Sequence, residues 1–241
     1  LNYMDVHDPY LPPQPYRNMF SATQNPGGLF NARLGSRPAM SPGQVQGEID
    51  AYDGAIAYVD SQISRLIAEI RTNRRRPLLI VVTSDHGEEF GEHGIFGHGR
   101  HLYREVIQVP LIMWEPGRLP RGKRISQPVS NAAIPATILG RLGASAETFH
   151  VPSLAPLWEG ALAGFPAPRS ELKHRPWELK EGAPVGVGSM RSLVDPSWHY
   201  IEVDNGRAEL FAWPTDLRES SNLADKPLSQ SVIERFKTSL R

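Results

Sequence analysis

Apolar side chains recur at steps of three and four along residues 45–70, as on one face of a helix: Val45, Ile49, Tyr52, Ile56, Val59, Ile63, Leu66 and Ile70. Just before them, Ser41 can cap a helix, Pro42 suits the first helical position and Gln44 can complete a capping box. The pattern predicts a long helix that begins at about residue 41. Basic residues at 71 and 74–76 favour its negative C-terminal end, and Pro77 closes it. We interpret this basic run as a solvated helix end rather than as a nucleic-acid patch.

The apolar run LLIVV at residues 78–82 has the length of a strand, and its continuity is typical of a strand buried on both faces of a parallel sheet. Residues 1–4 have the composition of the tail of an earlier strand, so strand, long helix and strand would form a right-handed crossover. A further strand is predicted at residues 109–113. A helix is predicted within residues 131–142, with Pro135 near its start and Gly143 as its stop.

The pattern changes after about residue 144. Residues 145–185 are rich in Pro, Ala and Gly without a clear period, and residues 14–40 also have the composition of a long surface loop. Beyond residue 185, short strands are predicted at residues 186–190, 191–194, 198–203 and 209–213, followed by a terminal helix that would bury Val232, Ile233, Phe236 and Leu240. We therefore expect an α/β domain over residues 1–144, a loop-rich connection over 145–185 and a small C-terminal α+β subdomain over 186–241.

Composition narrows the classes of partner. The 241 residues hold 26 basic and 26 acidic side chains, so a net charge of zero gives no general attraction for nucleic acid or for an anionic membrane. There is no cysteine, which excludes disulfides, thiolate metal ligands and a cysteine nucleophile from these residues. No stretch approaches the roughly 18 apolar residues of a membrane span. Residues 1–4 are neither a start methionine nor a signal peptide, and we expect the true N-terminus to lie upstream.

The candidate chemistry follows the strand predicted at residues 78–82. Asp85 and His86 stand directly after it, and ligands of open α/β sheets bind where loops converge at the carboxyl ends of strands. Residues 85–94, DHGEEFGEHG, combine carboxylates and imidazoles, which bind divalent cations, with glycines that let the backbone turn closely around an ion. For Asp85 and His86 alone, a strand-end turn with solvated side chains would be the better explanation. The extended segment favours a metal site.

The segment TSDHGEEFGEHG at residues 83–94, followed by VPLI at 109–112, closely resembles the sulfatase family of the alkaline phosphatase superfamily. Three further segments agree with it in the same order: YMDVHDPYLPP at residues 3–13, YDGAIAYVD at 52–60, and the short C-terminal segments at 198–201, 209–211 and 222–224. The resemblance implies an α/β fold. We expect an alkaline phosphatase-like layered sheet with helices on both faces, and a small C-terminal antiparallel sheet with a helix.

The resemblance also implies roles for individual residues. Asp85 and His86 match a metal-ligand pair, with calcium expected and manganese or zinc left open by the imidazole. His7 matches a histidine that contacts the sulfate and helps the leaving group. His98 stands twelve residues after His86, where the family often has a lysine, so a protonated imidazole would act there as donor or general acid. Glu88 and Glu92 would orient ligands rather than bind metal, and the alignments of His93 and His101 stay open.

The family's nucleophile has no counterpart in this sequence. In the family it is a formylglycine made from the Cys or Ser of a Cys/Ser-x-Pro-x-Arg segment, which lies upstream of the His7 segment together with two more metal-binding aspartates. This chain has neither a cysteine nor Ser-x-Pro-x-Arg. The resemblance therefore implies the C-terminal portion of a longer enzyme, inactive by itself. Family members are often periplasmic, extracellular or membrane-anchored through an N-terminal segment.

Three functions follow from these expectations. The first is a sulfuric ester hydrolase that acts on a sulfated small molecule or glycan. The second keeps the scaffold for a phosphorylated substrate, as a phosphodiesterase, a phosphonate monoester hydrolase or a phosphoethanolamine-type transferase, in which a Thr or Ser can be the nucleophile. His86 and His98 favour this alternative. The third is an inactive, truncated relative that serves as a binding module.

Overall fold

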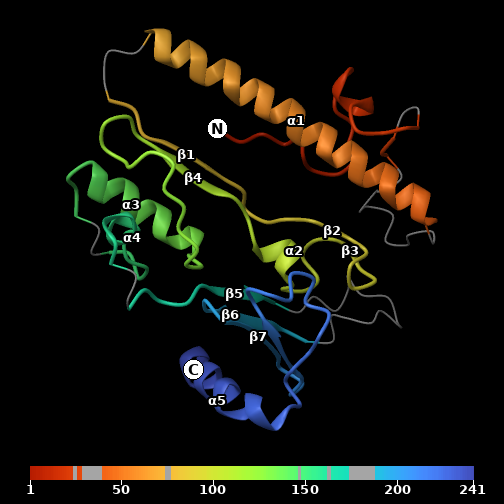
Figure 1. The fold of residues 1–241 in the computed structure, drawn as a ribbon, viewed down its shortest axis with the longest axis vertical. Helices are drawn as coiled ribbons and strands as arrows, with labels where there is room; N and C mark the ends of the chain where they lie inside the picture. Colours follow the sequence, from red (N-terminus) through yellow and green to blue (C-terminus); the bar gives the residue numbers. More distant parts are fainter. Residues whose placement is uncertain (24–25, 29–39, 74–76, 146–147, 162–163, 174–187) are drawn as a thin grey trace. The chain divides into compact units, whose positions relative to one another are not determined.

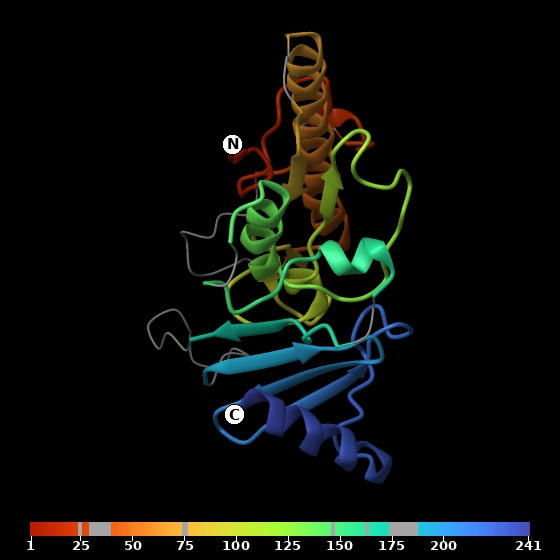
Figure 2. The same cartoon turned by 90° about the vertical axis from the view of Figure 1, so that its left-hand side faces the viewer.

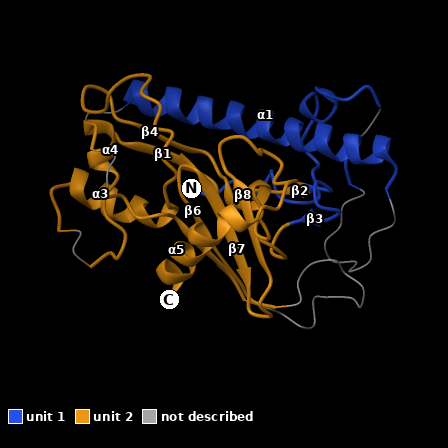
Figure 3. Ribbon diagram, turned by 60° about the horizontal axis from the view of Figure 1, so that its bottom comes forward, with its two compact units in different colours: residues 1–77, 90–97 blue, residues 78–89, 98–241 orange. Residues whose placement is uncertain are grey.

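The computed structural model describes residues 1–23, 26–28, 40–73, 77–145, 148–161, 164–173 and 188–241. Contacts divide the chain into two compact units, of which unit 1 comprises residues 1–77 and 90–97 and unit 2 comprises residues 78–89 and 98–241 (Figure 3). The predicted boundaries at residues 144 and 185 stay a prediction. Among the described residues, no helix is both long and apolar enough to cross a bilayer.

Unit 1 is built on the long helix α1, Pro42–Asn73 (Figure 1). Its predicted capping box is confirmed, because the backbone N–H of Ser41 donates to Oε1 of Gln44 (2.8 Å) and the N–H of Gln44 donates to Oγ of Ser41 (3.4 Å). The short helix η1, Tyr16–Asn18, packs on α1 at Gly54, where a Cβ would lie 2.3 Å from the carbonyl oxygen of Tyr16. The basic residues at 74–76 lie outside the described residues.

Tyr10 anchors the proline-rich N-terminal segment in unit 1. Its side chain is fully buried, and its ring lies 5.2 Å from that of Tyr52 in an edge contact and 5.7 Å from that of Phe90. Residues 1–4 form no strand, so the predicted crossover was wrong. The four residues LNYM are too short a pattern to define a strand.

Unit 2 begins with β1, Ile80–Thr83, which pairs antiparallel with β4, Leu111–Trp114. The prediction of a parallel strand buried on both faces was wrong, since β1 is only half-buried and its described sheet has two strands. An apolar run predicts the length of a strand but not whether the neighbouring strand is parallel or antiparallel to it. In the sequence between these two strands come β2 (Glu89–Phe90) and its partner β3 (Phe96–Gly97), whose residues 90–97 belong to unit 1, and then the short helix α2 (Arg104–Ile107) of unit 2.

The predicted helix after residue 130 is confirmed as η3, Asn131–Ala133, continued by α3, Ile134–Arg141. Ser130 caps it, since its Oγ accepts a hydrogen bond from the N–H of Ala132 (3.2 Å). A short helix within the predicted loop region, α4 (Ala155–Glu159), packs against it through buried Leu157.

The C-terminal sheet of unit 2 is antiparallel with the order β5 (Arg169–Leu172), β6 (Met190–Val194), β7 (Trp198–Val203) and β8 (Ala208–Ala212). Three of its strands agree with the prediction. β5 was missed because it lies in the loop-rich stretch and only one of its four residues, Leu172, is apolar. The strand predicted at residues 186–190 is described only from residue 188, and β6 starts at Met190.

Helix α5, Gln230–Leu240, follows the 3-10 turn η5, Pro227–Ser229, and lies along one face of this sheet (Figure 2). Phe236 stacks on Tyr200 with ring centroids 5.7 Å apart, within a core that also holds Leu193, Leu210, Ile233 and Leu240. Because side chains alternate along a strand, Ile201 and Phe211 face the other side of the sheet, where they contact Tyr103. The sheet thus supports α5 on one face and the start of α2 on the other.

Candidate metal centre

The loop that follows β1 is held by its own polar groups. Oγ of Ser84 donates to the carbonyl oxygen of His86 (2.7 Å), and the N–H of His86 donates to Oδ1 of Asp85 (3.1 Å). These bonds close a tight turn that presents two consecutive ligand-type side chains, Asp85 and His86, at the end of the strand.

Gly87 fixes this loop to helix α2. Its N–H donates to the carbonyl oxygen of Val106 (2.7 Å), and a Cβ at this position would lie 2.0 Å from the carbonyl oxygen of Glu105. No other residue type fits such a close approach of two backbones. Packing on α2 therefore requires glycine at this position, while the predicted close turn of the backbone around an ion stays a prediction.

Asn131 braces the loop from the other side. From the first turn of η3, its Nδ2 donates to the carbonyl oxygen of Ser84 (2.8 Å), while its Oδ1 accepts from Oγ1 of Thr83 (3.2 Å). Sequence reasoning missed this residue. Its only signal was a position beside a helix start, which does not identify a contact 47 residues away.

Asp85 and His86 have the geometry of a ligand pair. Nδ1 of His86 lies 2.9 Å from the carbonyl oxygen of Gly87, so it carries the proton and leaves Nε2 as the acceptor nitrogen. Nε2 lies 3.8 Å from Oδ2 of Asp85, whose side chain is 88% exposed. An accessible oxygen and an accessible imidazole nitrogen at this separation fit a shared divalent cation.

The charge of Asp85 suits the same role. Burial raises the pKa of its carboxyl, but the neighbouring His86 and hydrogen bonds from the backbone and from Ser84 outweigh it, so the pKa lies below the usual value of 3.8. The carboxylate is therefore ionised at neutral pH, as a metal ligand must be.

The structure brings His98 to this pair. The rings of His86 and His98 stack with centroids 3.9 Å apart, and Nδ1 of His98 lies 3.0 Å from Oε1 of Glu88. The Glu88 side chain is 5% exposed, whereas that of His98 is 27% exposed. Glu88 thus accepts a hydrogen bond from Nδ1 of His98. This leaves Nε2 of His98 as the ring nitrogen that a bound molecule would contact.

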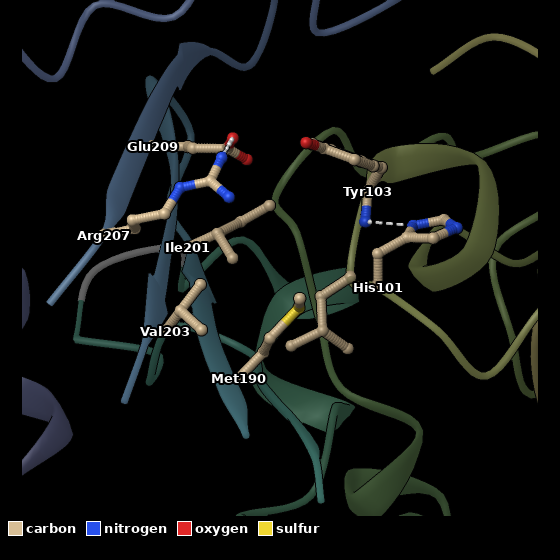
Figure 4. A pocket seen from close by; sticks show the side chains of 8 residues that line it. His101, Tyr103, Met190, Ile201, Val203, Arg207 and Glu209 are labelled. Carbon is tan, nitrogen blue, oxygen red and sulfur yellow. Dashed lines mark hydrogen bonds and ion pairs between the residues drawn. The ribbon is translucent and has the colours of Figure 1, made fainter. Parts of the chain in front are cut away.

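His101 belongs to the interior rather than to the surface of the loop. Its Nδ1 accepts from the backbone N–H of Tyr103 (3.3 Å), as Figure 4 shows, and its Nε2 lies 2.5 Å from Oε2 of Glu89. Both side chains are buried. His101 orients a buried carboxylate, and this role differs from the contact with substrate that its position in the sequence left open.

The remaining predicted residues lie in unit 1. Nδ1 of His7 is 2.8 Å from the carbonyl oxygen of Asp8 and 2.9 Å from its Oδ1, and the side chain is 42% exposed. Oε2 of Glu92 accepts from the N–H of Phe90 (2.7 Å) and so closes its own turn. His93 lies in the same unit. The placement of His7 beside Asp85 and His86 stays a prediction.

Comparisons with known proteins place this chain in a family. The family model described as Sulfatase matches residues 1–144. Choline-sulfatase of Rhizobium meliloti is 26% identical over 191 residues, which are 78% of this chain and 36% of that protein. A sulfatase of Formosa agariphila is 27% identical over 213 residues, or 84% of this chain and 37% of that protein. The chain thus spans little more than a third of the length of these relatives.

The fold is found in solved structures of about twice this length. The phosphonate monoester hydrolase of Agrobacterium radiobacter superposes with a TM-score of 0.77 at 22% identity, over 97% of this chain and 54% of that one. This likeness confirms the predicted fold class. Since the family model covers more than half of the sequence, including the Asp85 loop, the chain belongs to the sulfatase family.

Proposed function

We propose that the protein containing this chain is a metal-dependent sulfuric ester hydrolase in which Asp85 and His86 supply two of the metal ligands. The observation that carries this proposal is the pairing of the two side chains, with Nε2 of His86 as an acceptor 3.8 Å from Oδ2 of Asp85. The remaining ligands and the nucleophile, a formylglycine, would come from a segment outside this chain. By itself the chain would be inactive.

A bound divalent cation would polarise a sulfate oxygen and offset the charge that develops on it. Calcium is the first candidate because a carboxylate and further oxygens suit it. Manganese and zinc remain candidates because imidazole is a good ligand for both. The chain's own contribution is to hold Asp85 ionised and His86 in the tautomer that exposes Nε2.

His98 would act on the leaving group. With Nδ1 held by Glu88, a protonated ring would donate from Nε2 to the oxygen that departs with the organic part of the substrate. His7 would contact the sulfate. A substrate that is a sulfate ester of a small molecule or of a glycan is consistent with relatives such as choline-sulfatase.

A second candidate function is hydrolysis or transfer of a phosphoryl or phosphonyl group on the same scaffold. The observation that favours it is the pair of stacked imidazoles, His86 and His98, the second of which stands where the family often has a lysine. The likeness to a phosphonate monoester hydrolase is in fold only, and so fits both candidates. A third candidate, a binding module without activity, would keep the metal pair but lack turnover.

Substrate choice separates these functions. The full-length protein would be assayed with 4-nitrophenyl sulfate, bis(4-nitrophenyl) phosphate and 4-nitrophenyl phenylphosphonate, with metal content measured on the same sample. A preference for the sulfate supports the proposal, and a preference for either phosphorus ester supports the second function. Bound metal without turnover of any ester supports the third.

The metal ligands are tested by substitution. We expect Asp85→Ala to remove metal and turnover together, whereas the exposed Asp225→Ala in the same unit changes neither. Full activity of Asp85→Ala with no bound metal would refute the proposed site.

A further inference from the structure

Glu219 is a buried carboxylate in the C-terminal part of unit 2, 2% exposed. It is the one non-glycine residue with a positive φ, 46°, in the part of the chain that the structure describes. Side chains held in this left-handed region are fixed by their surroundings and cluster at functional sites.

Both carboxylate oxygens of Glu219 have partners. Oε2 accepts from the backbone N–H of Arg104 (2.9 Å), and Oε1 lies 2.5 Å from Nδ1 of His199 on β7. Arg104 is the first residue of α2, so its N–H has no partner within the helix. Glu219 thus accepts a hydrogen bond from the first backbone N–H of α2 and links this end of the helix to the C-terminal sheet.

Two further contacts hold the start of α2 on the same sheet. The Arg104 guanidinium donates to the carbonyl oxygen of Trp213 and lies over its ring, 3.6 Å from the centroid. The Tyr103 ring packs against that of Phe211 on β8, with centroids 6.0 Å apart, and Tyr103 and Glu209 border a small cavity between the loop and the strands (Figure 4). Helix α2 is therefore fixed at its N-terminus by the C-terminal sheet.

The other end of α2 carries the loop. Val106 accepts from the N–H of Gly87, and Gly87 is in close backbone contact with Glu105. Gly87 in turn accepts from Nδ1 of His86. A continuous series of contacts therefore runs from Glu219 through Arg104 and α2 to the imidazole of His86.

We propose that Glu219 is a positioning residue for the metal-binding loop, through which the C-terminal sheet sets the affinity of the site for its cation. This inference rests on the proposed function, since it requires Asp85 and His86 to bind metal. Residues that orient metal ligands from outside the coordination sphere typically change affinity by about 10- to 100-fold.

The test compares Glu219→Leu with Glu219→Gln in the full-length protein, by titration with calcium and manganese well below the melting temperature. Leu leaves the N–H of Arg104 without an acceptor, so we expect its metal Kd to rise about tenfold or more. Gln keeps an acceptor oxygen, and a rise of less than about threefold is expected. Equal losses in both variants, or no loss in either, would overturn the proposal.

Glu115→Leu is the matched control. Glu115 is equally buried and pairs with Arg141 (2.8 Å), but it follows β4 at the end of the β1–β4 pair away from the loop. We expect this variant to lose stability and keep its metal Kd. A loss of affinity equal to that of Glu219→Leu would show a general effect of destabilisation and contradict the proposal.

A second pair of variants keeps the test decisive if Glu219→Leu does not fold. Arg104→Ala and Arg104→Pro both remove the guanidinium, but only proline removes the N–H, and proline is tolerated at the first position of a helix. We expect Arg104→Pro to bind metal about tenfold more weakly than Arg104→Ala. Equal affinities would reject the role of Glu219.

The Asp85→Ala variant separates this inference from the proposed function. If Asp85→Ala binds metal as the parent protein does, the metal site itself is wrong. If Asp85→Ala loses metal while the Glu219 and Arg104 variants do not, only the positioning role fails.

Discussion

The imidazole rings of His86 and His98 lie face to face, with centroids 3.9 Å apart and planes 27° from parallel. One ring has its Nδ1 at a backbone carbonyl oxygen and the other has its Nδ1 at the buried carboxylate of Glu88. The two rings therefore present their Nε2 atoms as a pair. This arrangement joins a candidate metal ligand to a candidate proton donor, and replacing either ring changes the packing of the other.

His98→Ala is expected to lower kcat by about 10²- to 10⁴-fold on an alkyl sulfate, because a poor leaving group needs a proton from the enzyme. The loss should be smaller on 4-nitrophenyl sulfate, whose leaving group departs unprotonated. His98→Lys, which restores the residue common in the family, should keep most of the activity. Equal losses on both substrates would show that His98 does not protonate the leaving group.

Gly87→Ala tests the close approach of the loop to α2. A Cβ would lie 2.0 Å from a backbone oxygen of Glu105, and neither backbone can yield easily. We expect a loss of about 1–3 kcal/mol in the free energy of unfolding, measured by urea denaturation, together with weaker metal binding.

Gly43→Ala is the control for that substitution. Gly43 lies in α1, and an added Cβ would meet no atom within 4 Å. Alanine should stabilise the helix there by about 0.5–1 kcal/mol. If both glycine variants behave alike, the contact of Gly87 with α2 does not constrain the loop.

Asn131→Ala removes the brace between η3 and the loop. The carbonyl oxygen of Ser84 and the hydroxyl of Thr83 would each lose a partner, at a cost of about 1 kcal/mol per bond. We expect metal affinity to fall about tenfold as the loop loosens. Asn131→Asp keeps the acceptor for Thr83 but loses the donor to Ser84. Calorimetric titration of both variants shows which bond matters, and unchanged affinity in both would exclude the brace.

The sequence predicted the local elements well where a repeated pattern and an end signal agree. Helix α1 has both an apolar stripe and a capping box, and α5 buries Ile233, Phe236 and Leu240, three of the four residues that its period selected. The direction of β1 could not be predicted, because the apolar run at residues 78–82 looks the same whether the neighbouring strand is parallel or antiparallel.

Only the residues of the candidate site that would contact a metal or a substrate could be predicted from the sequence. Asp85, His86 and His98 came from a resemblance, and the structure brings these three together. Asn131 and Glu219 act on the loop through backbone groups that are distant in sequence, and no residue type or spacing marks such contacts. Supporting residues therefore needed the folded chain.

Asp216 gives a prediction for pH. Burial raises the pKa of its carboxyl, but hydrogen bonds from the N–H groups of Ser221 and Ser220 and from the Ser220 hydroxyl outweigh it, so the pKa lies below the usual 3.8. A carboxyl with a lowered pKa in the folded state adds stability that is fully present above its unfolded pKa. That stability is lost as the pH falls through the folded pKa.

We therefore expect Asp216→Asn to be less stable than the parent protein at pH 7, and the difference to shrink below about pH 4. Urea denaturation across this range measures it, with the exposed Asp225→Asn as a variant that should show no such dependence. If the difference in unfolding free energy stays constant down to pH 3, the asparagine destabilises the fold through its geometry and not through the loss of charge. The Asp216 turn leads directly into Glu219, since the Glu219 N–H donates to the Asp216 carbonyl oxygen. Protonation of Asp216 should therefore loosen Glu219 and weaken metal binding in the parent protein. Asp216→Asn lacks this carboxyl, so acid should weaken its metal binding less.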